Sequence, residues 1–110
     1  MDAIRLLKSA GVLPDWMERA REIERLRAEC ERLWRIAELE YPRAASLGDA
    51  RFAEWQARTW AGLEQVMTRI NSLVLAYNCT APACAAPQTP YNLAQQQARF
   101  WERFGGEGRE

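Results

Sequence analysis

The longest uninterrupted helical pattern in the sequence runs from Pro14 to Tyr41. Apolar residues recur along it at intervals of seven with further apolar positions beside them, whereas the remaining positions are mostly Glu and Arg. This pattern predicts an amphipathic helix over residues 14–41 with a heptad-like apolar stripe. Pro14 suits a first helical position, and Pro42 follows the expected end. The stripe comprises Trp16, Ala20, Ile23, Leu26, Cys30, Leu33, Trp34 and Ala37.

A second long helix is predicted over residues 49–78, after a loop that begins at Pro42. Ser46 is followed three residues later by Asp49, which matches a capping box, and Asp49 alone could also cap. Asn78 is expected as the C-terminal cap residue. The apolar stripe of this helix comprises Phe52, Trp55, Thr59, Leu63, Val66, Met67, Ile70, Leu73, Val74 and Tyr77.

Two long amphipathic helices joined by a short loop predict an antiparallel, coiled-coil-like hairpin in an all-α fold. Short helices are expected to flank it at residues 1–10 and 91–104, the second preceded by a Pro-rich extended or turn segment over residues 79–90. All 110 residues then form a single domain.

Aromatic residues are too numerous for one seam between two helices. The chain has five Trp and three Phe, so either the terminal segments fold over the hairpin or two chains pair into a bundle. Gly62 lies in the middle of the second helix, where glycine costs about 1 kcal/mol relative to alanine. We expect it to allow the close approach of a bulky neighbour such as Trp34.

The charge balance argues against nucleic acid as a partner. Fifteen basic residues match fifteen acidic ones, whereas nonspecific nucleic-acid binding relies on a basic excess. No apolar run approaches the roughly 20 residues that span a bilayer, so no membrane interaction is expected. The N-terminal residues also lack the order of charged and apolar segments typical of a signal peptide, and a cytoplasmic location follows as an expectation.

The absence of histidine restricts the chemistry that the chain can perform. It excludes Ser-His and Cys-His nucleophile pairs, histidine metal ligands and an imidazole switch near neutral pH. An odd number of cysteines without a signal peptide indicates reduced thiols. We therefore expect no cofactor, no metal and no catalytic residue.

Two groups of potential ligands have simpler explanations. Cys79 and Cys84 could form half of a metal site or a disulfide, but structural zinc usually needs four ligands, and Cys30 lies on the apolar stripe, so packing thiols are favoured. A carboxylate metal cluster is disfavoured because these residues are expected to point outward and di-metal bundles also use histidine. Its candidates are Glu18, Glu22, Glu29 and Glu64.

Four aromatic residues are the candidate partner-binding residues. Trp60, Phe100 and Trp101 lie off the main stripe or on the terminal helix, where we expect exposure, and Phe104 belongs to the apolar face of that helix. Exposed aromatic patches usually mark protein contacts. Aromatic residues on the stripe itself, such as Trp34, are expected in the core.

Two stretches resemble a known family. The first is Ile4–Glu24, which reads IRLLKSAGVLPDWMERAREIE, and the second runs from Trp55 to Pro82 and ends in INSLVLAYNCTAP. Both resemble a conserved domain of unknown function that occurs in DnaJ-homologue subfamily C member 28 proteins and, in bacteria, as a stand-alone protein. The resemblance covers roughly three quarters of the chain and rests on short motifs. The matching positions are Ala10, Gly11, Leu13, Pro14, Trp16, Asn71, Leu75, Tyr77, Asn78 and Pro82.

The resemblance implies a chaperone-associated module and assigns no catalytic residues. Family members usually carry an upstream segment that ends in a Gly-Lys-Pro-rich turn, which this sequence does not contain, so a function carried by that segment is not expected. The chain also lacks the His-Pro-Asp tripeptide with which a J domain stimulates the ATPase of a partner chaperone.

The leading hypothesis is a non-catalytic protein-interaction module whose protein partner the sequence does not identify. The alternative is a structural module that assembles with itself, as a homodimer. A third hypothesis, an enzyme that works through Asp, Glu, Arg, Tyr or Cys, requires a closed pocket with converging carboxylates.

Overall fold

Residues 14–105 are described by the computed structural model, and they contain three helices: α2 (Asp15–Ala45), α3 (Asp49–Thr80) and α4 (Leu93–Phe104). This part of the chain has no β-strand, which confirms the all-α expectation for it. The short helix expected over residues 1–10 lies outside the described residues.

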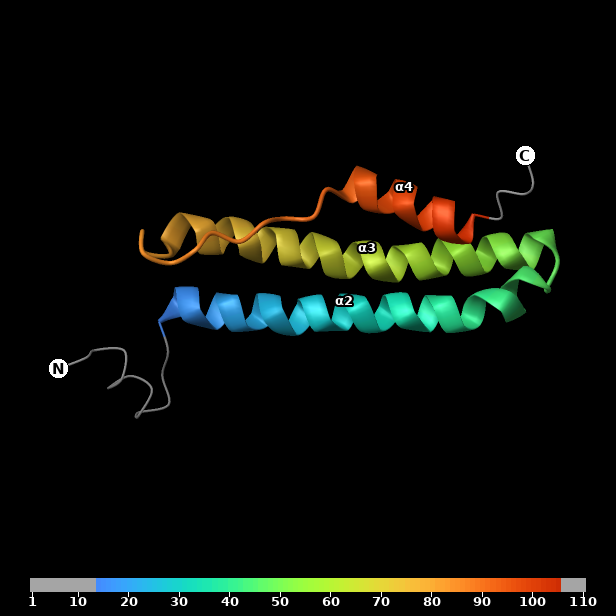
Figure 1. Cartoon of the computed structure of the whole chain (residues 1–110), viewed down its shortest axis with the longest axis horizontal. Helices are drawn as coiled ribbons and strands as arrows, with labels where there is room; N and C mark the ends of the chain where they lie inside the picture. The colour runs from blue at the N-terminus through green and yellow to red at the C-terminus, as the bar shows by residue number, and fades with distance from the viewer. Residues whose placement is uncertain (1–13, 106–110) are drawn as a thin grey trace.

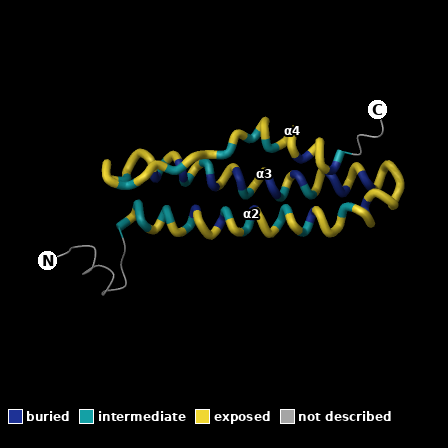
Figure 2. The backbone as a smooth tube through the Cα atoms, viewed as in Figure 1, coloured by how far each residue is buried: buried dark blue, intermediate teal, exposed yellow. Residues whose placement is uncertain are grey.

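The helices α2 and α3 form the predicted antiparallel hairpin (Figure 1). The rings of Trp16 and Tyr77 lie 6.3 Å apart at one end of it, and those of Tyr41 and Phe52 lie 6.0 Å apart at the other. The apolar stripes of the two helices face each other, and buried positions recur along the whole of α3 (Figure 2).

The sequence predicted that the first long helix ends before Pro42, and this prediction is wrong. The helix α2 continues through it to Ala45, because a proline in the last turn removes only its own N–H and keeps a helical φ. Ser46 then caps the end, its N–H and its Oγ donating to the carbonyl of Arg43 at 3.1 and 2.7 Å. The loop between the two long helices is therefore only residues 46–48.

The predicted capping box at the start of α3 is wrong. The N-cap residue is Gly48, and no side chain caps this helix. Ser46 is occupied at the end of α2, so its hydroxyl is not used here. Gly48 has a φ of 98°, a conformation that glycine adopts without steric cost.

The helix α3 also ends later than predicted, at Thr80. Asn78 therefore lies inside the last turn and is not the cap residue. Ala81 closes the helix by donating its N–H to the carbonyl of Tyr77 at 2.8 Å. Asn78 uses its side chain elsewhere, because the chain reverses after Thr80 and passes beside it.

The Pro-rich segment is ordered and runs back along α3 (Figure 1). We call residues 81–85 the hinge, which contains a turn closed by the Ala85 N–H and the Pro82 carbonyl at 2.9 Å. Residues 86–92 form the strap. The helix α4 follows the strap two residues later than predicted, with the Asn92 side chain accepting from the Gln95 N–H at 3.1 Å.

One part of the core lies between α2 and α3, around Ile23, Ile70 and Val74, and another lies between the hairpin and this returning chain. Phe100 and Phe104 of α4 are fully buried, so a terminal segment folds over the hairpin, which is the first of the two arrangements that the aromatic content suggested. The residues buried under α4 and along the middle of the hairpin are Cys30, Ala37, Ala44, Phe52, Trp55, Trp60, Leu63 and Met67.

Candidate functional site

The expectation that three of the candidate aromatic residues are exposed is wrong for two of them. Trp60 is 7% exposed and Phe100 is 0% exposed, while Trp101 is 37% exposed. Phe104, the fourth candidate, is 1% exposed. Side chains this deeply buried belong to the core of the folded chain, which leaves Trp101 as the only one of the four at the surface.

The reason is the way in which α4 packs against both long helices. The ring of Phe100 lies 5.5 Å from that of Trp60 on α3, and the ring of Phe104 lies 5.5 Å from that of Tyr41 on α2. Trp34 also contacts both phenylalanines. Phe100 and Phe104 are spaced by four, which places them on one face of a helix. That spacing is the sequence signal for burial.

Two asparagines on α3 hold the strap by its backbone. The Asn71 amide donates to the Tyr91 carbonyl at 2.9 Å and accepts from the Tyr91 N–H at 2.8 Å. Asn78 makes the same pair of bonds with Gln88, at 3.0 and 2.9 Å. Each side-chain amide thus satisfies one N–H and one C=O that would otherwise lack a partner in the protein. The sequence analysis missed this role.

The spacing of the two pairs follows from helix and chain geometry. Asn71 and Asn78 are seven residues apart, which is about 10.5 Å along a helix. Gln88 and Tyr91 are three residues apart, which is about 9–10 Å of extended chain. A polyproline-like chain also repeats every three residues, so both residues can present their backbone to α3.

Three further side chains contact the backbone of the returning chain. The Tyr77 hydroxyl donates to the Ala86 carbonyl at 3.1 Å. Arg27 of α2 donates to the Thr89 carbonyl at 2.7 Å. At the far end, Gln56 donates to the Phe104 carbonyl at 2.6 Å, which explains why Gln56 is buried.

The strap also closes over Cys30. Tyr91 packs against the core cluster that contains Cys30, and the Arg27 guanidinium lies 5.3 Å from the centre of the Tyr91 ring. Burial raises the pKa of the Cys30 thiol above 9.0 and that of the Tyr91 hydroxyl above 10.0. Cys30 therefore packs as a neutral thiol, as its position on the apolar stripe predicted.

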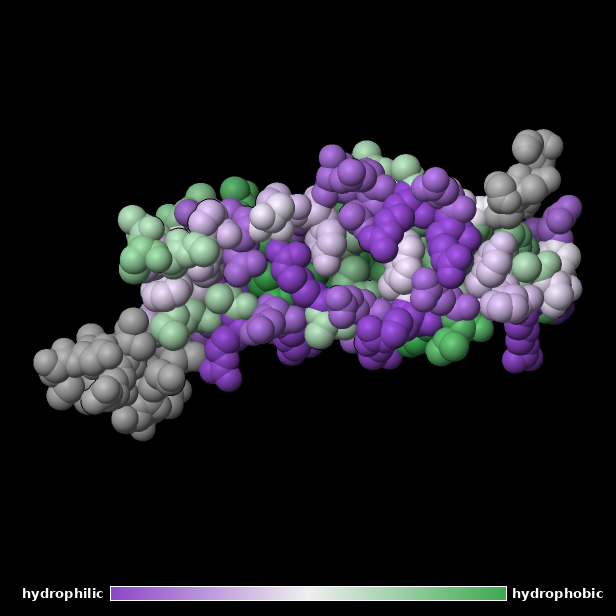
Figure 3. Space-filling view, in the orientation of Figure 1, coloured by the Kyte–Doolittle hydropathy of each residue, from purple (hydrophilic) through white to green (hydrophobic). Residues whose placement is uncertain are grey.

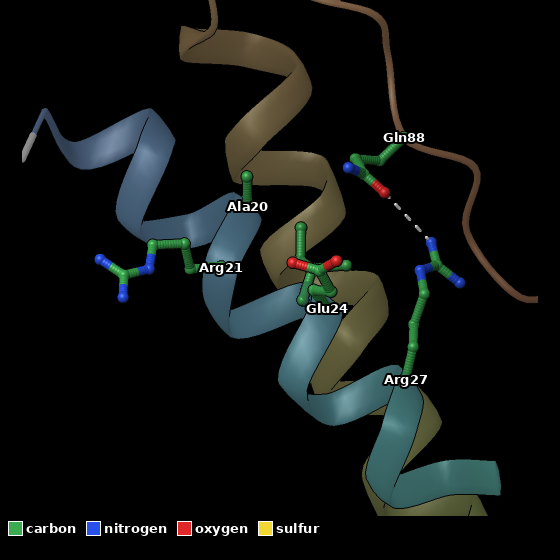
Figure 4. Close-up of a pocket in the computed structure, with 6 residues that line it drawn as sticks. Ala20, Arg21, Glu24, Arg27 and Gln88 are labelled. Atoms are coloured by element: carbon green, nitrogen blue, oxygen red, sulfur yellow. Dashed lines mark hydrogen bonds between the residues drawn. The ribbon is translucent and has the colours of Figure 1, made fainter.

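A surface depression lies between α2 and the strap, with a volume of about 370 Å³. Figure 4 shows Arg27 and Gln88 pointing toward each other across it, 3.5 Å apart at their closest polar atoms, whereas Arg21 points away. Arg21 and Arg27 therefore do not converge on one point of this depression. Hydrophilic side chains are frequent on the face of the molecule drawn in Figure 3, with apolar groups between them.

The side of the hairpin opposite the strap carries partly exposed apolar groups. Gly62 precedes the strap-binding Asn71 by nine residues, and Ile36 follows the strap-binding Arg27 by nine. Nine residues are about two and a half helical turns, so both lie on the side away from the strap. We call this surface the open face, which comprises Leu33, Ile36, Thr59, Gly62, Val66 and Leu73.

The sequence suggested that Gly62 makes room for Trp34, and this expectation is wrong. A Cβ placed on Gly62 meets no atom within 4 Å in the described part of the chain. Trp34 lies on the other side of the hairpin, where it contacts Phe100 and Phe104. Gly62 therefore has open space beside it.

Cys79 and Cys84, the candidates for a metal site or a disulfide, are exposed free thiols. Residues 14–105 contain no group of three or more His, Cys, Asp or Glu side chains placed to hold a metal ion. Across the same residues, no helix is both long enough and apolar enough to cross a membrane.

None of the family models, curated proteins or solved structures with which the chain was compared matches it. The resemblance to the DnaJ-homologue domain stays a prediction. The structure does give a physical role to three of the residues that carry it, since Asn71, Tyr77 and Asn78 all bind the returning chain.

Proposed function

We propose that this protein is a non-catalytic protein-interaction module that binds an amphipathic helix of a partner protein along its open face. Leu33, Ile36, Val66 and Leu73 are partly exposed there, although they also pack against the core or lie beside residues that do. No described element covers them. Helix-in-groove binding uses such a stripe of apolar positions between two packed helices.

The charges beside the open face support an amphipathic partner. Glu22 and Glu29 of α2 form ion pairs with Arg25 and Arg32, each at 2.6 Å. A partner helix with an apolar stripe and polar flanks would place its apolar groups over Ile36 and Val66 and keep its charges near these pairs. The open space beside Gly62 leaves room for a side chain of the partner. The family resemblance suggests that the partner is associated with chaperones.

A photocrosslinking experiment tests this proposal. A photoreactive amino acid at position 36 on the open face should crosslink a partner in cell extract, and the same group at position 75 should not. Leu75 is 68% exposed but lies four residues from Asn71, on the strap side. Equal capture from both positions, or no protein captured at position 36, would contradict the proposal.

The second candidate function is self-assembly through the same face. Two copies that share the open face would cover each other's partly exposed Ile36 and Val66. In the crosslinking experiment, this function predicts that position 36 captures the protein itself, also with purified material. A Val66→Glu substitution should then abolish the dimer in sedimentation.

A further inference from the structure

Residues 86–104, comprising the strap and α4, act as one arm that lies in a groove on the hairpin. Hydrogen bonds from α3 side chains hold the extended part of the arm, through Asn71 and Asn78. Aromatic packing holds its helical part, through Phe100 and Phe104. The arm groove therefore has a defined ligand chemistry: an extended segment that presents its backbone, followed by a short helix with two phenylalanines spaced by four.

The hinge packs against the core only at its two ends, through Ala81 and Ala85. Pro82, Ala83 and Cys84 are exposed, and the two backbone hydrogen bonds here are the one that closes α3 and the one inside the hinge turn. The arm's contacts with Asn71, Asn78, Arg27 and Gln56 start beyond the hinge. They depend on the register of the arm in the groove and not on the path by which the chain reaches it.

We propose that the arm is exchangeable, so that the arm groove of one copy binds the arm of a second copy in the same register. Every contact described above can form between two chains because the same residues meet. The hydrogen bonds and buried rings of the two forms are then equal, and the difference in free energy comes from the hinge and from association. This inference concerns the strap side and leaves the open face free.

The normal hinge favours the arm of the same chain. A short flexible connection gives an effective concentration in the millimolar range, so the unchanged protein should hold its own arm at lower concentrations. Shortening the hinge removes this advantage. Without residues 81–85, the arm can reach its own groove only if the last turn of α3 unwinds, since the chain must reverse within residues 79, 80, 86 and 87.

The first test deletes residues 81–85 from the full chain and measures its mass by sedimentation equilibrium. We expect a dimer in which the amide protons of Gln88 and Tyr91 exchange as slowly as in the unchanged protein. The control replaces the same five residues with Gly and Ser, keeps the hinge length and should be a monomer. A monomeric deletion variant, or a larger aggregate with fast exchange at both amides, would overturn the proposal.

The second test keeps the hinge and weakens the chain's own arm. A full-length Phe100→Ala, Phe104→Ala variant should bind a synthetic peptide of residues 86–105 with saturable one-to-one stoichiometry in calorimetry. A peptide that carries the same two alanines should bind at least about tenfold more weakly, because the two buried rings are its only advantage over the chain's own arm. Absence of binding by the unchanged peptide, or equal binding of the two peptides, would overturn the proposal.

Discussion

Asn71 and Asn78 serve the strap as a neighbouring β-strand would, by pairing with both the N–H and the C=O of one residue each. A helix has no free backbone groups to offer in its interior. A side-chain amide can donate and accept at once, through its NH₂ and its C=O. The strap thereby gains ordered hydrogen bonds without belonging to a sheet.

We predict that Asn71→Ala loosens the strap and lowers the free energy of unfolding by about 1–3 kcal/mol. Two backbone groups of Tyr91 lose their partner, and the site is partly buried. Amide hydrogen exchange should accelerate at Tyr91. Asn71→Asp is the control with intermediate behaviour, because a carboxylate still accepts from the Tyr91 N–H but cannot donate to its carbonyl. Unchanged exchange at Tyr91 would contradict this prediction.

The contact between Cys30 and Tyr91 predicts a dependence of stability on alkaline pH. Burial raises the pKa of both groups in the folded chain, from 9.0 for the thiol and 10.0 for the phenol. The folded state therefore holds these protons more tightly than the unfolded state. Their stabilisation is complete below the ordinary pKa values and is lost as the pH rises through the folded ones.

Urea unfolding between about pH 7 and pH 10.5, a range that spans the ordinary thiol and phenol pKa values, measures this effect. The free energy of unfolding of the unchanged protein should fall across the upper half of that range. Cys30→Ala and Tyr91→Phe should each start from a lower stability and show a smaller decline. The variant that carries both substitutions is the control and should show the flattest profile. An equally flat profile for the unchanged protein would contradict the raised pKa values of Cys30 and Tyr91.

The ends of the helices α2 and α3 are set by their hydrogen bonds, and not by the residues that most often end a helix. Pro42 is such a signal, yet α2 passes through it because only one N–H is missing and Ser46 closes the helix three residues beyond Arg43. Asn78 is also a common cap residue, but its amide is better used by Gln88. The existence and pairing of the helices followed from periodicity, whereas their ends depended on partners distant in sequence.

Gly62 allows a prediction about α3 itself. Its position is helical, and a Cβ there meets no atom within 4 Å among the described residues. Gly62→Ala should therefore raise the free energy of unfolding by about 0.5–1 kcal/mol. The reverse substitution at its exposed neighbour, Ala61→Gly, should lower it by a similar amount. Thermal unfolding of both variants provides the measurement, and destabilisation by Gly62→Ala would mean that the open face is covered.

Across the whole molecule, α4 converts a thin hairpin into a domain with a core. The surplus of aromatic residues indicated that something must cover the hairpin. The position of Trp60, Phe100 and Phe104 off the main stripe or on the terminal helix nevertheless predicted a partner surface, and their burial shows that they belong to the core. Only the reversal at the hinge shows that the covering element is the end of the same chain.

The contribution of α4 can be measured by comparing two neighbouring residues on it. Phe100→Ala should cost about 3–5 kcal/mol, since the ring is fully buried. Trp101→Ala should cost far less, because this side chain is 37% exposed. Denaturant unfolding followed by circular dichroism gives both values. Similar losses for the two variants would show that Phe100 does not anchor α4 in the core.

The pairing of Asn78 with Gln88 and of Asn71 with Tyr91 restricts where residues can be inserted into or deleted from this chain. Pro87 and Pro90 stand directly before the two paired residues and carry no N–H. A slip of the strap that brought the preceding residue into each pair would therefore leave Asn78 and Asn71 facing prolines. Insertions inside the hinge change nothing at these pairs. An insertion between Gln88 and Tyr91 separates them from their asparagines unless α3 also lengthens. Natural variants of this protein should therefore differ in hinge length while keeping both spacings fixed.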